Sequence, residues 1–408
     1  MLRICAVLII LGGVATQLLG GPHLVLYSQG LGLVEETREF ALEGEGTLTI
    51  DYLPHQVLLD SLTLEGVTVL SLTPKLPVRI TPDGVVGEIV QVETQSGTVK
   101  GRLISASGDV LVLATEEGLV TVNGYRTIIA PSPGRRAVEV AYRAEEPGTR
   151  GLVVRYLTRG LSWQARYRAL LEGETLSLVG LAELVNDTGI SYPDAQVDLI
   201  AGQVYAPAGA GVLSEVRALA ASPQAGASPA YEYHRYRLAQ PVDLPPGSTF
   251  VPYLVTSLPC QRLYRFRGGP VETVLKFVNS AAPLPAGEVT VYGEGGSLLI
   301  GAASIDHVPV GEEVTLTIGA AFDLTGSRAQ TFHVRLSEEL NRDGYRIVIR
   351  SAKEEPVVVE VVESLPGAWQ ITQSSLPFEQ IDAHTVKFLL EVPAGGQAEL
   401  TYTVEWGY

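Results

Sequence analysis

The chain has 408 residues, more than a single compact core usually holds, so its length predicts two or three domains. Hydrophobic residues make up 46% of the chain and charged residues 18%, a composition that excludes disorder over most of its length. The formal net charge of −16 argues against a nucleic-acid-binding surface, because such a surface needs clustered Lys and Arg to neutralise phosphates.

The first twenty residues have the composition of a secretory signal peptide. Arg3 supplies a positive charge, an apolar run extends from Ile4 to Gly13, and small residues stand near position 20. An uncleaved N-terminal anchor is the alternative, because a clean Ala-x-Ala cleavage sequence is missing. No later stretch has about 18 uninterrupted apolar residues, so we expect no membrane span after residues 1–20 are removed. The protein is therefore predicted to be exported to the periplasm, the cell surface or the extracellular medium.

Removal of residues 1–20 would take Cys5 away and leave Cys260 as the single cysteine. A chain with one cysteine forms no internal disulfide, and export without disulfides is more typical of a bacterial envelope than of a eukaryotic ectodomain. We expect Cys260 to be a partly buried, unreactive thiol, because the sequence shows no nearby base that would activate it.

Period-two alternation of apolar and polar residues dominates the chain, as in 47–52 and 357–362. Gly, Pro, Asn-Gly and Asp-Gly breaks recur about every ten residues, and helical periodicity is nearly absent. We therefore predict an all-β protein of several antiparallel β-sandwiches with little helix. Trp163 and Trp369 are each expected to be buried in a separate sandwich core. Three pairs are expected to form hairpin turns: Asp83-Gly84, Asn123-Gly124 and Asp343-Gly344.

The strand pattern divides the chain into successive parts. Residues 21–83 are expected to form an N-terminal β segment, and the tightly spaced short strands of 84–131 predict a small SH3-like β-barrel. Longer strands favour one β-sandwich domain over 132–260 and a C-terminal one over 261–408. Residues 206–230 are rich in Ala, Gly, Pro and Ser, and we expect them to form a mobile loop.

A set of motifs keeps its order over roughly residues 140–408. These are Val153-Val154-Arg155-Tyr156, Gly160-Leu161-Ser162-Trp163, Val185-Asn186-Asp187-Thr188-Gly189, Tyr192-Pro193-Asp194-Ala195, Leu275-Lys276-Phe277-Val278-Asn279-Ser280, Leu284-Pro285-Ala286-Gly287 and Leu365-Pro366-Gly367-Ala368-Trp369. Together they resemble the bacterial domain of unknown function 4139, a family found in proteins labelled mucoidy inhibitor A. The resemblance implies no established activity, but the label suggests an effect on surface polysaccharide. Residues 21–139 look like the variable front end of such proteins, and their typical coiled-coil insertion is missing.

The sequence shows no catalytic, cofactor or metal motif. A His-Glu-x-x-His pair, a Gly-x-Ser-x-Gly elbow, a phosphate-binding glycine loop and an acidic calcium loop are all missing. Its Glu-Glu doublets are more typical of solvated loops than of a glycosidase pair, whose carboxyl groups must face each other. Asp306-His307 is the most enzyme-like adjacency, because a carboxylate can orient an imidazole, but no nucleophile accompanies it. We therefore predict no catalytic residue, no cofactor and no metal.

One candidate partner-binding surface lies directly after the predicted loop. A strand there would place four side chains on one face: Tyr231, Tyr233, Arg235 and Arg237. Tyr236 and Leu238 would lie on the opposite face, which is expected to point inward. Tyrosine can stack on sugar rings and arginine can pair with carboxylates, so the first face could hold an acidic polysaccharide or a partner's carboxylates. The alternative is that cross-strand neighbours cover this face and its arginines meet nearby acidic residues.

These observations favour an exported, non-catalytic binding or structural protein of the bacterial cell envelope, with an envelope protein or polysaccharide as partner. The alternative is an envelope glycan hydrolase whose carboxylates converge only in the fold. A concave pocket with two carboxylates about 5–10 Å apart would favour the hydrolase, and shallow surfaces would favour binding.

We expect the exported protein to begin near Gly21, because the short apolar run is followed by Gly20 and Gly21. Intact-mass measurement of the exported protein checks this, with the same chain retained in the cytoplasm as the full-mass control. A mass that still includes residues 1–20 would support the uncleaved anchor instead.

Overall fold

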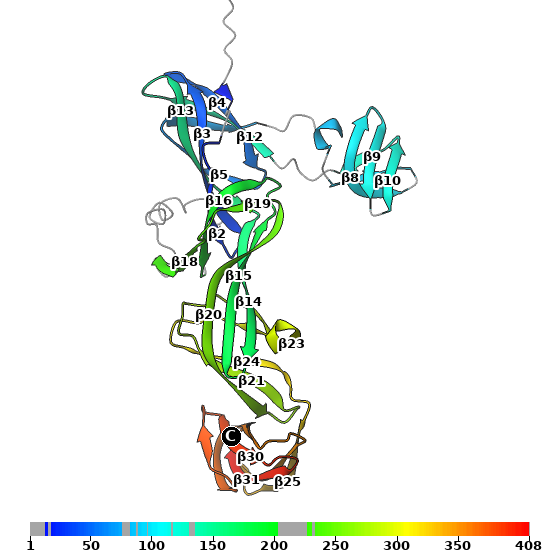
Figure 1. The fold of residues 1–408 in the computed structure, drawn as a ribbon, viewed down its shortest axis with the longest axis vertical. Helices are drawn as coiled ribbons and strands as arrows, with labels where there is room; N and C mark the ends of the chain where they lie inside the picture. The colour runs from blue at the N-terminus through cyan, green and yellow to red at the C-terminus, as the bar shows by residue number, and fades with distance from the viewer. Residues whose placement is uncertain are drawn as a thin grey trace, which may run out of the picture. The chain divides into compact units, whose positions relative to one another are not determined.

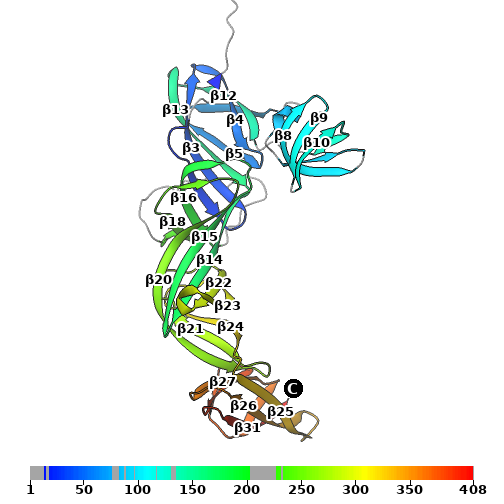
Figure 2. The ribbon, with the colours of Figure 1, turned by 45° about the vertical axis from the view of Figure 1, so that its right-hand side comes forward.

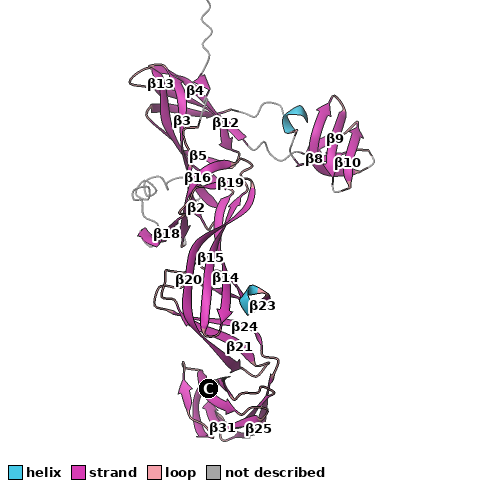
Figure 3. Cartoon of the chain, in the orientation of Figure 1, coloured by secondary structure: helices cyan, strands magenta, loops and turns pink. Residues whose placement is uncertain are grey.

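The computed structural model describes residues 13–14, 18–75, 82–86, 89–95, 97–115, 117–129, 135–202, 227–230 and 233–407. Over these residues the chain forms 31 strands and two short 3-10 helices, which confirms the predicted all-β class (Figure 3). The helices are η1 (Pro82–Val85) and η2 (Glu294–Gly296). Neither of these described helices has the length and apolar character that a membrane span requires.

The chain divides into two compact units. Unit 1 comprises residues 1–164 and 182–251, and unit 2 comprises residues 165–181 and 252–408. The limits of the units fall inside three long strands that lie side by side in the order β14 (Leu161–Glu172), β15 (Thr175–Asn186) and β20 (Gly247–Phe266) (Figures 1 and 2).

The largest sheet of unit 1 has eight strands. Seven of them follow the order β17 (Ala227–Ala230), β18 (Tyr233–Arg237), β16 (Tyr192–Ala201), β2 (His23–Tyr27), β3 (Leu31–Leu42), β13 (Gly148–Arg159) and β5 (Val57–Glu65). The eighth, β19 (Val242–Leu244), pairs with β16. Strands β2 and β16 run parallel, so residues far apart in sequence, such as Val25 and Asp198, become neighbours.

A four-stranded sheet of unit 1 supplies much of its core. Its order is β1 (Gly13–Val14), β4 (Glu45–Pro54), β12 (Arg135–Arg143) and β6 (Thr68–Pro74). Alternate residues of β4 and β12, including Leu48, Ile50, Val138 and Val140, are buried, as period two requires when one face of a strand meets a core.

A five-stranded antiparallel sheet follows η1 and has its own core. Its order is β10 (Gly118–Asn123), β9 (Val110–Thr115), β8 (Thr98–Ser107), β7 (Ile89–Glu93) and β11 (Thr127–Ile129). Val90, Val92, Leu103, Leu111 and Leu113 are buried between its strands. No pairing joins the two edge strands, β10 and β11, among the described residues, so a sheet is found here and its closure into an SH3-like barrel stays a prediction.

Unit 2 contains most of a ten-stranded sheet. Eight strands follow the order β23 (Leu298–Ile305), β22 (Gly287–Gly293), β14, β15, β20, β27 (Val357–Ser364), β30 (Thr385–Val392) and β29 (Phe378–Gln380). Strand β21 (Glu272–Val278) pairs with β20 and with β24 (Glu313–Ala320).

A four-stranded sheet completes unit 2, in the order β25 (Leu324–Arg335), β26 (Leu340–Ser351), β31 (Gln397–Gly407) and β28 (Ala368–Ser374). Buried residues of both sheets of this unit form one apolar core, in which Phe266, Val361, Phe388 and Tyr402 are almost wholly enclosed.

The two predicted core tryptophans differ in the structure. Trp163 is 2% exposed, and its indole N–H donates to the Ile200 carbonyl at 2.9 Å, so its burial is confirmed. Trp369 is only half-buried, and its prediction of full burial is wrong. It lies on β28, an edge strand that has a neighbour on one side only, and it packs at the margin of the unit 2 core.

The three predicted hairpin turns have different outcomes. Asn123-Gly124 ends β10, where Gly124 adopts a φ of +71°, but it forms no hairpin, because β10 pairs with β9 and the following strand β11 pairs with β7. Asp83-Gly84 lies in η1 instead. Asp343-Gly344 lies inside β26 and forms no turn. The glycine is needed there because the Phe332 ring packs directly against its backbone. A Cβ on Gly344 would stand 2.3 Å from the Phe332 ring.

Two sequence predictions fall wholly or mostly outside the described residues. They are the signal peptide over 1–20 and the loop over 206–230, of which only Ala227–Ala230, the strand β17, is described.

We expect Trp163→Ala to lower the free energy of unfolding of its unit by roughly 3–5 kcal/mol, because a large buried ring is lost. Trp369→Ala should cost only about 1–2 kcal/mol, because that ring is partly exposed to water at the margin of the core. Urea unfolding followed by circular dichroism measures both. Trp163→Phe, which keeps a ring, is the control, and an equal or larger loss for Trp369→Ala would contradict the structure.

Candidate functional site

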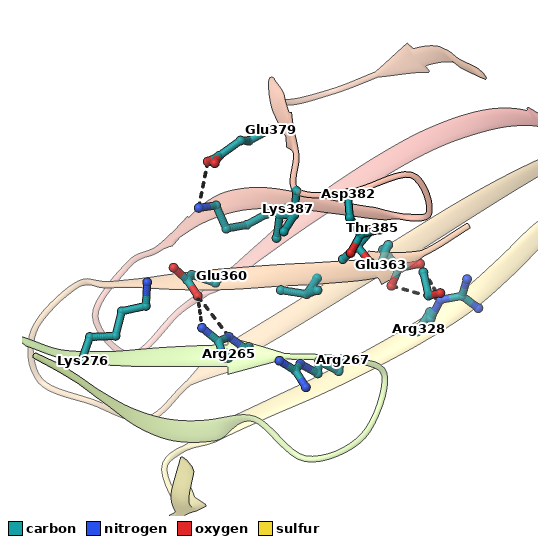
Figure 4. A pocket seen from close by; sticks show the side chains of 13 residues that line it. Arg265, Arg267, Lys276, Arg328, Glu360, Glu363, Glu379, Asp382, Thr385 and Lys387 are labelled. Carbon is teal, nitrogen blue, oxygen red and sulfur yellow. Dashed lines mark hydrogen bonds and ion pairs between the residues drawn. The ribbon is translucent and has the colours of Figure 1, made fainter. Parts of the chain in front are cut away.

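A pocket of about 780 Å³ in unit 2 is lined mainly by charged side chains (Figure 4). Five of its described lining residues are basic and four are acidic. The lining consists of Arg265, Arg267, Lys276, Arg328, Glu360, Val362, Glu363, Ser364, Glu379, Ile381, Asp382, Thr385 and Lys387.

Strand alternation explains why these charges line the pocket. On β27, Val359 and Val361 are fully buried in the core. Glu360 and Val362, which alternate with them along the strand, therefore point to the opposite face of the sheet. The same holds on β30, where Phe388 points into the core and Lys387 points away from it. The floor of the pocket is therefore the polar face of the sheet whose opposite face is the core. Glu363 is the exception, because it shares the core face of Val359 and Val361 and is 3% exposed.

Arg265 and Glu360 form the most enclosed ion pair of the pocket. They stand opposite each other where β20 and β27 run parallel. The Nε and Nη2 atoms of Arg265 donate to Oε2 of Glu360 at 3.1 and 2.9 Å, and the two side chains are only 11% and 12% exposed. Charge-assisted hydrogen bonds of this kind are shorter and stronger than neutral ones, so they fix the two side chains against each other.

Glu363 is held at the margin of the pocket by two groups. The Arg328 Nε donates to both of its oxygens, at 3.2 and 2.9 Å, and the Tyr402 hydroxyl donates to Oε2. Burial disfavours the charged guanidinium, but the Glu363 carboxylate outweighs that effect and raises the pKa of Arg328. The guanidinium also lies 4.0 Å from the centre of the Tyr345 ring, a cation–π contact that fixes it further.

The remaining carboxylates of the pocket are also engaged. Lys387 meets Glu379 at 2.8 Å. Asp382 accepts the backbone N–H of His384 at 2.7 Å, and this bond is the main cause of a lowered pKa of its carboxyl group. Glu379 and Asp382 therefore both have partners within unit 2.

Two cations of the pocket, Lys276 and Arg267, form no ion pair with a described carboxylate of the lining. Lys276 pairs with Glu313, which does not line the pocket. Arg267 follows directly after β20, is exposed, and makes no ion pair with any residue that the structure describes (Figure 4). Arg267 is therefore the lining guanidinium that has no ion-pair partner within the described residues.

The predicted surface of tyrosines and arginines is placed as follows. Tyr236 and Leu238 are buried, which confirms the predicted inward face. Arg237 donates from Nε and Nη2 to the two oxygens of buried Asp198, both at 2.7 Å. Tyr233 packs against a buried apolar cluster that includes Ile200.

Arg235 is half-buried on the same face as Tyr233 and Arg237, and Tyr231 lies outside the described residues. The structure thus places Tyr233, Arg235 and Arg237 on one face, and Arg237 is paired with Asp198 of the same unit. Partner binding there stays a prediction.

The Asp-His pairs that the structure forms, His23–Asp198 and His333–Asp343, are not adjacent in sequence. His307 accepts the backbone N–H of Ala286 at its Nδ1, 3.2 Å away, and so fixes a loop. His333 lies 2.6 Å from buried Asp343, which also accepts the indole N–H of Trp406 at 2.8 Å. Only the cross-strand register of β25 and β26 joins His333 to Asp343, and sequence spacing gave no signal for it.

Other features add no chemistry. Cys260 is buried, and burial raises the pKa of its thiol, as expected of an unreactive cysteine. No group of three or more His, Cys, Asp or Glu placed to hold a metal ion occurs in the described part of the chain. A second hollow, of about 1040 Å³, lies on the five-stranded sheet and is lined mainly by small and apolar side chains with Lys100, Arg102 and Glu117.

A scan against protein-family models finds no match for this chain, and a search of the curated proteins finds none either. The resemblance to the domain of unknown function 4139 therefore stays a prediction from the motifs.

Asp198 should make the stability of unit 1 depend on pH. Burial opposes its ionisation, but hydrogen bonds from Arg237 and His23 outweigh burial and lower its pKa from 3.8 to about 2. A lowered folded-state pKa gives stability that is present above about pH 4 and is lost as pH falls towards 2, on the order of 2 kcal/mol in total.

Urea unfolding of the wild type and of Asp198→Asn between about pH 2 and 6 measures this effect. The difference in unfolding free energy should shrink as pH falls. Asp60→Asn, at an exposed aspartate of β5, is the control. A difference that stays constant with pH would show that Asp198 does not carry the dependence.

Proposed function

We propose that the protein is an exported, non-catalytic binding protein of the bacterial cell envelope, and that the pocket of unit 2 binds a carboxylate-bearing partner. The observation that carries the proposal is the division of charge in the pocket. Every described carboxylate there is engaged by a cation or a backbone N–H, whereas Arg267 has no ion-pair partner among the described residues.

The chemistry of the lining supports a carboxylate as the bound group. A guanidinium can donate two parallel hydrogen bonds to one carboxylate. Val362 and Ile381 give apolar surface within the same lining, against which a sugar ring or an aliphatic chain could pack. A uronic-acid polysaccharide or an acidic segment of an envelope protein presents both features together.

The charge of the whole chain sets a condition on this binding. A protein with a formal charge of −16 repels a polyanion at long range, so attraction must come from the local cations of the pocket. Binding should therefore be short-range and should weaken as salt rises. The envelope location rests on the signal-like residues 1–20 and on the family resemblance, which both support export.

A glycan hydrolase is the second candidate, because the pocket is concave and holds several carboxylates. Hydrolysis of a glycosidic bond needs one carboxyl group as a proton donor beside an ionised one. Glu360 and Glu363 each accept hydrogen bonds from an arginine, so both are engaged in ion pairs within the protein. The contacts therefore favour binding over hydrolysis.

We expect the mature chain to bind an oligogalacturonate, and Arg267→Ala to weaken that binding about tenfold, which corresponds to ~1.4 kcal/mol. Isothermal titration calorimetry measures the dissociation constant, with a neutral dextran oligosaccharide and a poly-glutamate peptide as the other probes. Arg262→Ala is the matched control, because Arg262 is an exposed arginine of β20 that does not line the pocket.

Equal binding of dextran and oligogalacturonate, or equal loss with Arg262→Ala, would refute recognition of a carboxylate by this pocket. Preference for poly-glutamate would identify a protein partner. Release of new reducing ends from the oligogalacturonate would refute the non-catalytic assignment.

A further inference from the structure

Two cations of the unit 2 pocket stand far apart along its floor. Lys276 on β21 is opposite Gln261 of β20, whereas Arg267 directly follows the end of β20. Gln261 and Arg267 are separated by six steps of extended chain, and each step rises about 3.3 Å, so the backbone positions of the two cations are about 20 Å apart along the strand direction. Figure 4 shows the Arg265–Glu360 pair between them.

Both cations can bind a ligand carboxylate without breaking an enclosed ion pair. Lys276 meets Glu313 at 3.0 Å, and the Glu313 side chain is 55% exposed. A pair that is open to solvent on this scale contributes little, because water screens both charges. Arg267 makes no ion pair in the described residues. Arg265 differs, because it is enclosed together with Glu360 and loses that partner only at a high cost.

Aliphatic side chains lie on the surface between the two cations. Strand β27 is parallel to β20, so it runs from the level of Lys276 towards that of Arg267. Its outward face carries Val358, Glu360 and Val362 in that order. Val358 is exposed and Val362 lines the pocket, so aliphatic surface lies on both sides of the central charge pair.

Leu389 and Ile381 enlarge this aliphatic surface. Leu389 stands opposite Glu360 on β30, Ile381 lines the pocket, and both are exposed. The described residues that line the pocket include no aromatic side chain. The C–H groups of a sugar ring pack best on the negative face of an aromatic ring, so this lining suits the aliphatic side chains of a peptide better than a polysaccharide.

An extended peptide matches the order of these groups. Its alternate side chains face the same way, so residues i, i+2, i+4 and i+6 can all contact the sheet. The distance from i to i+6 is about 20 Å, equal to the separation of the two cations. Carboxylates at i and i+6 would then reach Lys276 and Arg267, and aliphatic side chains at i+2 and i+4 would cover the surface between them.

We propose that the unit 2 pocket recognises an acidic segment of a partner protein in extended form, with carboxylates six residues apart and aliphatic side chains between them. This inference rests on the proposed function, of which it names the partner class. Lys276 and Arg267 are the two anchors, and the Arg265–Glu360 pair stays intact beneath the bound segment.

Two peptides of equal composition, blocked at both ends, test the spacing. The first has the sequence Glu-Ser-Leu-Ser-Leu-Ser-Glu and the second Glu-Ser-Glu-Ser-Leu-Ser-Leu, so their charges are equal and the distance between carboxylates differs. Isothermal titration calorimetry with the full chain measures both dissociation constants. The first peptide should bind about tenfold more tightly, because it alone reaches both cations, which corresponds to ~1.4 kcal/mol.

Substitution of either anchor tests the assignment of the two cations. Lys276→Ala and Arg267→Ala should each abolish the preference for the first peptide, because one anchor is then missing. Arg262→Ala, at an exposed arginine of β20 that does not line the pocket, is the control and should keep the preference. The comparison of the two peptides on the unsubstituted chain does not depend on how any variant folds.

The outcomes separate this inference from the proposed function. Equal binding of the two peptides, with both weakened by Arg267→Ala, would overturn the two-anchor inference and leave carboxylate binding by the pocket in place. Binding of oligogalacturonate without binding of either peptide would identify a polysaccharide ligand and overturn the inference alone. Failure of oligogalacturonate and of both peptides to bind would overturn the inference and the proposed function together.

Discussion

Alternation of side chains across β20, β27 and β30 lets one sheet form both the core and the pocket of unit 2. Phe266, Val361 and Phe388 fill the core from one face, and the residues next to them in sequence point to the other face. A shift of one residue in register would exchange the two faces and place charges in the core. The apolar core therefore fixes the pocket geometry, although no core side chain needs to touch a ligand.

Two of the most buried charged residues of this protein, Asp198 and Arg265, are paired with a residue opposite them on a neighbouring strand. Asp198 stands opposite Arg237, and Arg265 stands opposite Glu360, in each case on neighbouring strands. Breaking a buried pair by removing one partner costs about 3–5 kcal/mol, because the other charge stays uncompensated. Such pairs therefore specify which strands must lie side by side more than they add net stability, and wrong registers are excluded by charge as well as by the apolar pattern.

Local pattern was enough to predict the all-β class, the burial of Trp163 and the inward face of Tyr236, because each follows from period two within one strand. Local pattern failed where contacts between residues on neighbouring strands determine the conformation. Asp343-Gly344 has the composition of a turn, yet Gly344 lies mid-strand under the Phe332 ring. The pocket could not be predicted either, since its central pair joins residues 95 apart through a parallel register that no local signal encodes.

The same pairing distinguishes recognition from catalysis. For Glu360 to donate a proton, Arg265 would have to lose its partner in a site where both side chains are largely enclosed, which leaves an uncompensated charge. A carboxylate that arrives at Arg267 breaks no such pair, because this guanidinium is exposed and has no ion-pair partner in the described residues. The pairs hold the floor of the pocket rigid before any ligand arrives, so less side-chain entropy is lost on binding. The proposed binding of an anionic group rests on these charge-paired walls and on the exposed guanidinium of Arg267.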